Sequence, residues 1–175
     1  MYKRQVASGP NTANPHAVPS DRVIEKGDFV LMDYGAGYCD YRSDMTRTVV
    51  MGEPTQEQLD LYALVRRTHE ECVAAIHPGV EGNDIFKLSK KIIGDAGYGD
   101  YYNHGLGHGV GIDIHELPNS NRSKNPIAIG SVVTMEPGVY LPGVGGVRLE
   151  DYGVVTENGY EPFTKTPHDL HVIDC

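Results

Sequence analysis

The sequence predicts an α+β domain made of two similar halves, each built around a pair of antiparallel strands. Three observations support this class. Two stretches rich in β-branched and aromatic residues, 27–50 and 131–157, have the composition of strand pairs. Two helical patterns, at 55–76 and from about residue 83 to 97, lie between them. The strand pairs also share an order of motifs, which indicates an internal duplication.

The first strand pair begins at Gly27. Its two segments, DFVLMDYG and CDYRSDMTRTVV, are joined through Gly35, Gly37 and Tyr38. Glycines between two such segments are typical of a tight connection. A hairpin is therefore expected, with Cys39 exposed at its tip.

Two helices are expected next. Thr55 and Gln58 have the spacing of a capping box at the start of the first, and His77-Pro78-Gly79 ends it at Ile76. The second begins near Asn83 and ends near 94–97, with apolar residues on one face. The predicted apolar stripe of the first helix consists of Leu59, Leu64, Val65, Cys72, Val73 and Ile76.

A second strand pair follows a stretch rich in glycine and histidine, NHGLGHGVGIDIHELP. The segments SVVTMEPGVY and VRLEDYGVVTE have strand composition, and the turn-forming residues LPGVGG join them. This pair is predicted to form a second hairpin.

The two strand pairs match each other motif by motif. The matched features are H-x-x-P at His16 and His115, acid-x-Gly at Asp33 and Glu136, and a second acid at Asp44 and Glu150. The second acid lies 11 residues beyond the first in one half and 14 in the other. A pseudo-twofold pairing of the halves would bring four carboxylates to one centre.

The duplication also predicts a gap. Two helices precede the second strand pair, but no equivalent helices precede Val6. A sheet without a covering layer would expose its apolar face to solvent. The chain is therefore expected to be an N-terminally truncated catalytic domain spanning 6–175. Residues 1–5, MYKRQ, are expected to be a non-native leader and are left out of the fold prediction.

Composition excludes several classes of partner. The net charge is -9, and the sequence has no cluster of basic residues. Neither nucleic acid nor an anionic membrane surface is therefore an expected partner. No apolar run approaches the roughly 18 residues of a membrane span. Three widely spaced cysteines without a C-x-x-C motif favour a reducing compartment. A cytoplasmic location is therefore expected.

The paired acids predict a metal site. Carboxylate and imidazole are the ligands that hard and borderline divalent cations prefer. His108, between Gly107 and Gly109, offers an imidazole on a backbone that can come close to a metal. A single acid on a strand is usually solvated, but four at matching points of a duplicated hairpin would repel one another unless cations compensated them. The expected ligands are Asp33, Asp44, His108, Glu136 and Glu150.

Four motifs then resemble a known family. L-M-D-Y-G-A-G-Y-C-D-Y-R-S-D-M-T-R-T, H-G-L-G-H-G-V-G-I-D-I-H-E-L-P, T-M-E-P-G-V-Y and G-G-V-R-L-E-D are similar, in order and spacing, to motifs of the Xaa-Pro peptidase branch of the pita-bread metallopeptidases. The resemblance extends from about Val6 to Ile173. It implies the pita-bread fold, in which helices cover an antiparallel sheet, and hydrolysis of an Xaa-Pro bond at a peptide N-terminus or in a dipeptide.

The resemblance also implies a dinuclear centre. In the family, residues that match Asp33 and Asp44 hold one ion and those that match His108 and Glu136 hold the other, while Asp44 and Glu150 would bridge the two. Manganese is the usual occupant in this branch, with cobalt or zinc as alternatives. Two cations about 3.5 to 4 Å apart can share a water and deliver hydroxide to the scissile carbonyl. Glu136 could relay the proton to the imino nitrogen of proline.

Further residues are expected around that centre. Histidines that match His16, His104 and His115 line the pocket of the family and contact the substrate. Arg148 resembles an arginine that orients the acids. The remaining histidines, His69, His77, His168 and His171, are expected to be surface or packing residues.

Two other functions stay open at this point. Methionine aminopeptidases share the five-ligand plan, although S-D-M-T-R-T and His104, four residues before His108, favour the proline-directed branch. A non-catalytic binding module on the same fold is the second alternative, and here all five ligand positions hold competent residues. The expected partner is a peptide with proline at its second position. A homodimer is an open alternative, as is the choice between dipeptides and longer peptides.

Overall fold

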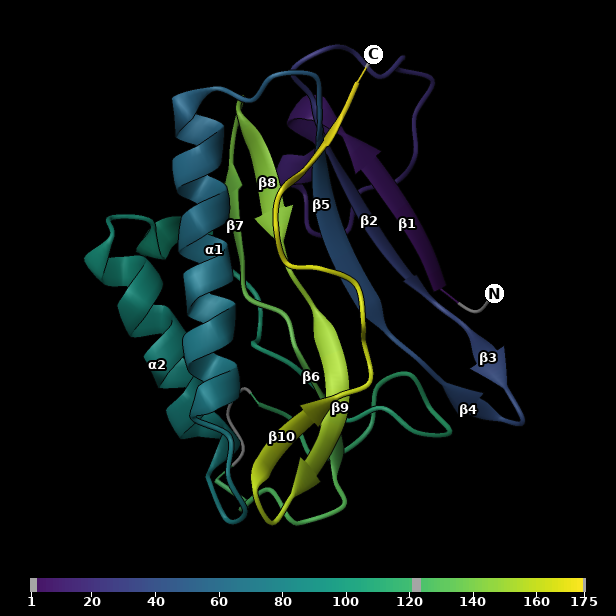
Figure 1. Ribbon diagram of the computed structural model, residues 1–175, viewed down its shortest axis with the longest axis vertical. Helices are drawn as coiled ribbons and strands as arrows, with labels where there is room; N and C mark the ends of the chain where they lie inside the picture. The colour runs from purple at the N-terminus through teal and green to yellow at the C-terminus, as the bar shows by residue number, and fades with distance from the viewer. Residues whose placement is uncertain (1–2, 121–123, 175) are drawn as a thin grey trace.

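The computed structural model describes residues 3–120 and 124–174, and for Lys3 and Arg4 the backbone alone. It confirms the α+β class (Figure 1). The strands are β1 (Lys3–Ser8), β2 (Phe29–Gly35), β3 (Gly37–Tyr38), β4 (Tyr41–Arg42), β5 (Met45–Met51), β6 (Val132–Met135), β7 (Gly138–Leu141), β8 (Gly145–Arg148), β9 (Asp151–Thr156), β10 (Gly159–Pro162) and β11 (His171–Ile173). The helices are α1 (Gln56–Ala74), α2 (Gly82–Asp95) and two 3-10 helices, Gly9–Ala13 and Gly99–Tyr101.

The strands form two main sheets and two small hairpins. The larger sheet has the order β1-β2-β5-β11 and the smaller β10-β9-β6, with β3-β4 and β7-β8 paired separately. β2 and β5 are antiparallel, with Asp33 opposite Thr46. The first predicted hairpin is therefore confirmed.

The tip of the first hairpin differs from the expectation in one detail. Cys39 is exposed at the tip, as expected, but Cys39 and Asp40, the first residues of the expected second segment, form the turn between β3 and β4, with φ of 47° and 67°. Ser43 and Asp44 then separate β4 from β5. Backbone in the left-handed region cannot continue a strand. Because β4 ends at Arg42 and β5 begins at Met45, Asp44 lies just before a strand rather than within one.

The second hairpin is also confirmed, but it is interrupted on both sides. Glu136 and Pro137 separate β6 from β7, and Leu149 and Glu150 separate β8 from β9. Pro137 has no N–H to donate to a sheet, so an unbroken strand through it is disfavoured. Both acids therefore occupy the interruption between two paired segments, β6-β9 and β7-β8.

The two helices begin and end close to where the sequence predicts. Both hydrogen bonds of the capping box are present, from Gln58 N–H to Thr55 Oγ1 (3.2 Å) and from Thr55 N–H to Gln58 Oε1 (2.9 Å). Leu59 was assigned to the apolar stripe wrongly, since its side chain is 40% exposed. The buried positions of α1 follow helical spacing without it: Gln58, Leu61, Tyr62, Leu64, Val65, Thr68, His69 and Cys72.

The main hydrophobic core lies between the helices and both hairpins, and it includes Phe29 of β2 and Val50 of β5. Its fully buried members include Leu61 and Val65 of α1, Ile93 of α2, Val147 of β8 and Leu149. Figure 1 shows α1 and α2 together on one side of the molecule, with β1, β2 and β5 on the other.

Residues 1–5, expected to be a non-native leader, were left out of the fold prediction, but three of them lie in a strand. Lys3–Gln5 form the first half of β1, and Gln5 pairs with Asp33 of β2. Sheet pairing uses backbone groups and needs no particular side chain, which is why the sequence did not reveal it. Met1 and Tyr2 lie outside the described residues, and the non-native origin of the segment stays a prediction.

None of the helices in the described part of the chain has the length and apolar character needed to cross a membrane.

Candidate metal centre

The two hairpins cross at Thr46 and Glu150. Glu150 N–H donates to the Thr46 carbonyl (3.1 Å), and Thr46 Oγ1 donates to Glu150 Oε2 (2.5 Å). Two residues further along β5, Thr48 Oγ1 donates to the Arg148 carbonyl (3.0 Å). These bonds connect β5 to the second hairpin, so acids from both halves of the chain lie at one place.

The predicted ligands lie around this crossing. Asp33, Asp44 and Glu150 are 2%, 0% and 0% exposed, and Glu136 is half-buried. Potential ligand atoms of Asp44, His108 and Glu150 all lie within 4.8 Å of one another. Glu136 Oε1 is 3.5 Å from His108 Nε2, and Asp44 Oδ2 is 3.8 Å from the same nitrogen. We refer to Asp33, Asp44, His108, Glu136 and Glu150 as the candidate metal centre.

His108 is fixed by the backbone on either side of it. Its N–H donates to Thr134 Oγ1 (3.0 Å), and its carbonyl accepts from Thr134 N–H (2.8 Å). A Cβ on Gly107 would lie 2.1 Å from the Thr134 carbonyl oxygen, so only glycine permits this approach. Nδ1 of His108 is 3.0 Å from the Gly109 carbonyl, which accepts its proton and leaves the Nε2 lone pair facing the acids.

Arg148 positions Asp33. Its Nη2 donates to Asp33 Oδ2 (2.6 Å), and its Nε donates to Thr46 Oγ1 (3.2 Å), the hydroxyl that also contacts Glu150. Burial alone would lower the pKa of Arg148, but the neighbouring Tyr140, Asp33 and two glutamates raise it well above its ordinary value. Arg148 is therefore a permanent cation beside the acids.

The three predicted pocket histidines line one cavity of about 130 Å³. His16 and His115 are exposed, and the His115 ring lies 4.2 Å from that of His108, centroid to centroid. The lining residues are Pro15, His16, Asp33, His104, Gly105, Gly107, His108, His115, Glu136 and Arg148. Asp44 and Glu150 are fully buried and are not part of the lining.

A hydrogen-bonded chain that the sequence did not predict connects His104 to Arg148. His104 Nδ1 is 2.7 Å from the Gly105 carbonyl, and its Nε2 is 2.8 Å from the Tyr140 hydroxyl. Arg148 Nη1 donates to the same hydroxyl (3.0 Å). Burial, together with the charge of Arg148, lowers the pKa of His104 to about 4, so the ring is neutral and accepts from Tyr140.

The chemistry of these residues fits divalent cations. Carboxylates buried this close together repel one another, and each loses its hydration. Arg148 is one positive charge in contact with one of them, Asp33. Four carboxylates and one imidazole form a donor set that suits manganese, cobalt or zinc.

A second group of ligand-type side chains lies outside this cavity. His69, Asp151 and His168 also have potential ligand atoms within 4.8 Å of one another. His69 is fully buried and His168 partly buried, whereas His77 and His171 are exposed. His69 and His168 were expected to be surface or packing residues, and no sequence pattern predicts that they meet at one carboxylate.

Comparison with known proteins identifies close relatives. The sequence profile of metallopeptidase family M24 matches residues 1–157. The chain is 43% identical to the Xaa-Pro dipeptidase of Pyrococcus horikoshii over 166 residues, which are 94% of this chain and 47% of that protein. The chain thus spans about half the length of the curated relatives it matches.

Solved structures agree in fold. An Xaa-Pro dipeptidase from Bacillus anthracis superposes with a TM-score of 0.95 and 43% identity, covering 98% of this chain and 49% of that one. An X-Pro aminopeptidase from Thermotoga maritima has the same TM-score at 37% identity, with 98% and 49% covered. The expected pita-bread fold is confirmed.

Proposed function

Since this chain belongs to metallopeptidase family M24, we propose that it carries the catalytic centre of a metal-dependent exopeptidase that hydrolyses Xaa-Pro bonds. The observation that carries this proposal is the convergence of Asp44, His108 and Glu150 within 4.8 Å, beside a cavity lined by histidines. Relatives named Xaa-Pro dipeptidase or X-Pro aminopeptidase support the choice of substrate.

In this proposal the five residues of the candidate metal centre hold two divalent ions, with Mn²⁺ as the first choice and Co²⁺ or Zn²⁺ as alternatives. Such ions supply a water of lowered pKa and polarise the scissile carbonyl. Asp33 and Asp44 would hold one ion and His108 and Glu136 the other, with Glu150 as a further ligand. The Thr46 hydroxyl, 2.5 Å from Glu150 Oε2, orients that carboxylate.

Glu136 is the proposed proton carrier. It lines the cavity and is half-buried, so its carboxylate can reach both the centre and a bound peptide. It accepts a proton from the attacking water and passes it to the proline nitrogen, which must be protonated to leave. His16 and His115, exposed at the cavity, are proposed to hydrogen-bond the substrate, while His104 is held in the wall by Tyr140.

The test is metal-dependent release of proline. The purified chain is treated with a chelator, supplied with Mn²⁺ and assayed on an Xaa-Pro dipeptide, a longer Xaa-Pro peptide and a Met-Ala peptide. Cleavage of the proline substrates is expected, and the pair of proline substrates separates dipeptidase from aminopeptidase. Cleavage of the methionyl substrate alone would contradict the proposed specificity. No metal-dependent cleavage of any substrate would favour a binding module.

A matched pair of variants tests the role of Glu136. Glu136→Gln keeps the shape of the side chain but cannot carry a proton, so turnover should fall by about 10² to 10⁴. Glu157→Gln, at an exposed turn before β10, should keep wild-type activity. Equal activity of both variants would remove Glu136 from the mechanism. Cytoplasmic location and a homodimeric state remain predictions.

A further inference from the structure

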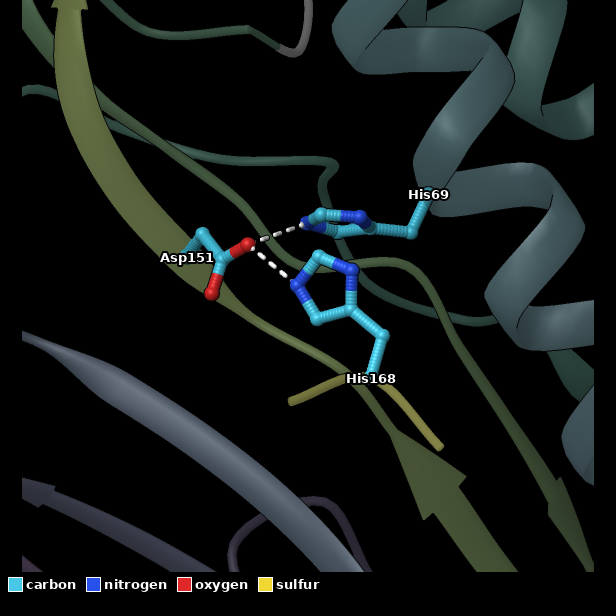
Figure 2. Close-up of side chains that lie close together, drawn as sticks. All are labelled: His69, Asp151 and His168. Atoms are coloured by element: carbon cyan, nitrogen blue, oxygen red, sulfur yellow. Dashed lines mark hydrogen bonds and ion pairs between the residues drawn. The ribbon is translucent and has the colours of Figure 1, made fainter. Parts of the chain in front are cut away.

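Two histidines and one aspartate meet on the side of β9 that faces α1. Figure 2 shows the rings of His69 and His168 directed at the same carboxylate, that of Asp151. His168 Nε2 is 2.6 Å from Asp151 Oδ2, and His69 Nε2 is 3.5 Å from the same oxygen. The three residues come from α1, from the start of β9 and from the segment between β10 and β11. We call them the α1–β9 cluster.

This cluster is separate from the candidate metal centre. Asp151 follows Glu150 directly, but successive side chains along extended backbone point to opposite sides. Glu150 contacts Thr46 of β5, whereas Asp151 contacts the two histidines and Arg47. The cluster and the centre share no residue, and the cluster does not line the cavity.

Within the α1–β9 cluster, His69 gives the strongest reason to expect a bound ligand. Its side chain is 2% exposed, and neither ring nitrogen makes a hydrogen bond within the part of the chain that the structure describes. Burial lowers the pKa of His69 to about 4, so the 3.5 Å contact with Asp151 is not an ion pair at neutral pH. A buried polar group without a hydrogen bond costs free energy, and metal coordination would satisfy a neutral imidazole nitrogen.

The distances suit a small cation after one adjustment. Ligand atoms about 2.0 to 2.2 Å from a tetrahedral zinc ion lie roughly 3.3 to 3.5 Å apart. The 3.5 Å between His69 Nε2 and Asp151 Oδ2 meets this value, whereas the 2.6 Å to His168 Nε2 is a hydrogen bond that would have to open. His168 can move, because it lies outside any strand or helix and its side chain is 29% exposed.

Arg47 leaves one carboxylate oxygen for the ion. Its Nη2 donates to Asp151 Oδ1 (2.7 Å), so Oδ2 is the oxygen that both imidazoles face. Metal-binding carboxylates are commonly fixed by such a hydrogen bond. The positive charge of Arg47 also repels a cation, and one carboxylate offsets it here against four at the candidate metal centre, which predicts weaker binding at the α1–β9 cluster.

We propose that His69, Asp151 and His168 form an additional, structural site for a borderline divalent cation such as Zn²⁺. Two imidazole nitrogens and one carboxylate oxygen select this class over magnesium and calcium. Water completes the coordination on the exposed side of His168. The ion ties α1 to β9 and to the segment before β11.

Equilibrium dialysis with Zn²⁺ tests the site by counting bound ions in the full chain. His168→Gln removes the exposed ligand, and His171→Gln, an exposed histidine of β11, is the matched control. We expect His168→Gln to bind one equivalent fewer than wild type and His171→Gln to bind the wild-type number. The same number in all three proteins would overturn the site.

Two further measurements keep the result independent of the candidate metal centre and of folding. In a His108→Gln background, which removes a ligand of that centre, adding His168→Gln should still remove one equivalent. Zn²⁺ should also raise the Tm of wild type more than that of His168→Gln, while circular dichroism reports an unchanged fold for both. Equal Zn²⁺ shifts in Tm would count against the site, and His69→Gln repeats the comparison from the buried side.

Discussion

At the scale of single residues, Arg148 is the side chain on which the arrangement of the acids depends. It contacts Asp33, Thr46 and Tyr140 through three different nitrogens. Arg148→Lys keeps the charge but offers one ammonium in place of a planar fork. We expect metal affinity and turnover to fall by about 10- to 100-fold. Metal titration and kinetic assays on the purified variant measure both quantities.

The control for this substitution is Arg66→Lys. Arg66 is partly exposed on α1 and pairs with Glu70 and Asp169, and none of the three lines the cavity. It should leave metal affinity and turnover unchanged. If Arg148→Lys behaved like this control, the geometry of the guanidinium would have no role in holding Asp33.

Gly107, which precedes His108 of the candidate metal centre, gives a second prediction at the scale of single residues. In Gly107→Ala the new Cβ would meet the Thr134 carbonyl at 2.1 Å, so β6 or His108 must shift. We expect a loss of about 1 to 3 kcal/mol in the free energy of unfolding, and weaker metal binding. Urea denaturation and metal titration measure these effects.

Gly94→Ala is the matched comparison for Gly107→Ala. Gly94 lies in α2, and a Cβ there would meet nothing within 4 Å. Alanine should stabilise this helix by about 0.5 to 1 kcal/mol. A Gly107→Ala protein as stable as wild type would show that His108 does not need the close backbone approach.

Sequence patterns predicted the ligand-type residues of the centre better than the residues that hold them. The acids and His108 belong to local motifs, so their spacing alone indicated a site. Thr46 and Tyr140 have no such signal, because their roles depend on contacts across the fold. Thr46 contacts Glu150 at a separation of 104 residues, and Tyr140 contacts His104 at 36.

At the scale of elements, the start of α1 allows a direct test of local stability. Thr55→Ala removes the hydroxyl that accepts from Gln58 N–H. The loss of this cap should cost about 1 kcal/mol, with no change in metal binding. Thermal and urea unfolding measure it. Thr55→Ser, which keeps the hydroxyl, should be close to wild type, and an equal loss in both variants would contradict the capping role.

Both hairpins and both α-helices could be predicted because local residue patterns specify them. β11 could not, since its pairing with β5 is parallel and spans only His171–Ile173. β1 is similar, because its pairing with β2 depends on backbone groups, which carry no sequence pattern. Strands whose partners lie far away in the sequence leave little trace in composition.

At the scale of the whole molecule, two neutral histidines, one buried and one partly buried, predict sensitivity to mild acid. Burial lowers the pKa of both His69 and His104 from 6.5 to about 4. The unfolded chain takes up protons below pH 6.5 that the folded chain resists. Stability is therefore complete above pH 6.5 and is lost as the pH falls towards 4. At pH 5 the lowered pKa of each histidine should reduce the free energy of unfolding by roughly 1 to 2 kcal/mol.

Urea unfolding of metal-free protein at pH 7.5 and pH 5 measures this loss. His69→Leu should reduce the difference between the two conditions, while His171→Gln should not. Equal stability at both pH values would show that the two rings are protonated in the folded protein.

The overall arrangement was predictable from the duplication, but the way the halves join was not. Matching motifs indicated that two hairpins would meet, and the structure shows them crossing where β5 approaches Glu150. The interruptions at Glu136–Pro137 and Leu149–Glu150 set the place of two acids. Where these interruptions fall depends on how the paired hairpin bends, and the residue pattern of one strand does not encode that bend.

The crossing of Thr46 and Glu150 has a kinetic consequence. The bond joins residues 104 positions apart, so the loop between them must close before the acids of the two halves can meet. The ligands are then incomplete until late in folding. Bound cations should therefore slow the unfolding of the chain and leave its folding rate nearly unchanged, because the transition state precedes the assembly of the centre.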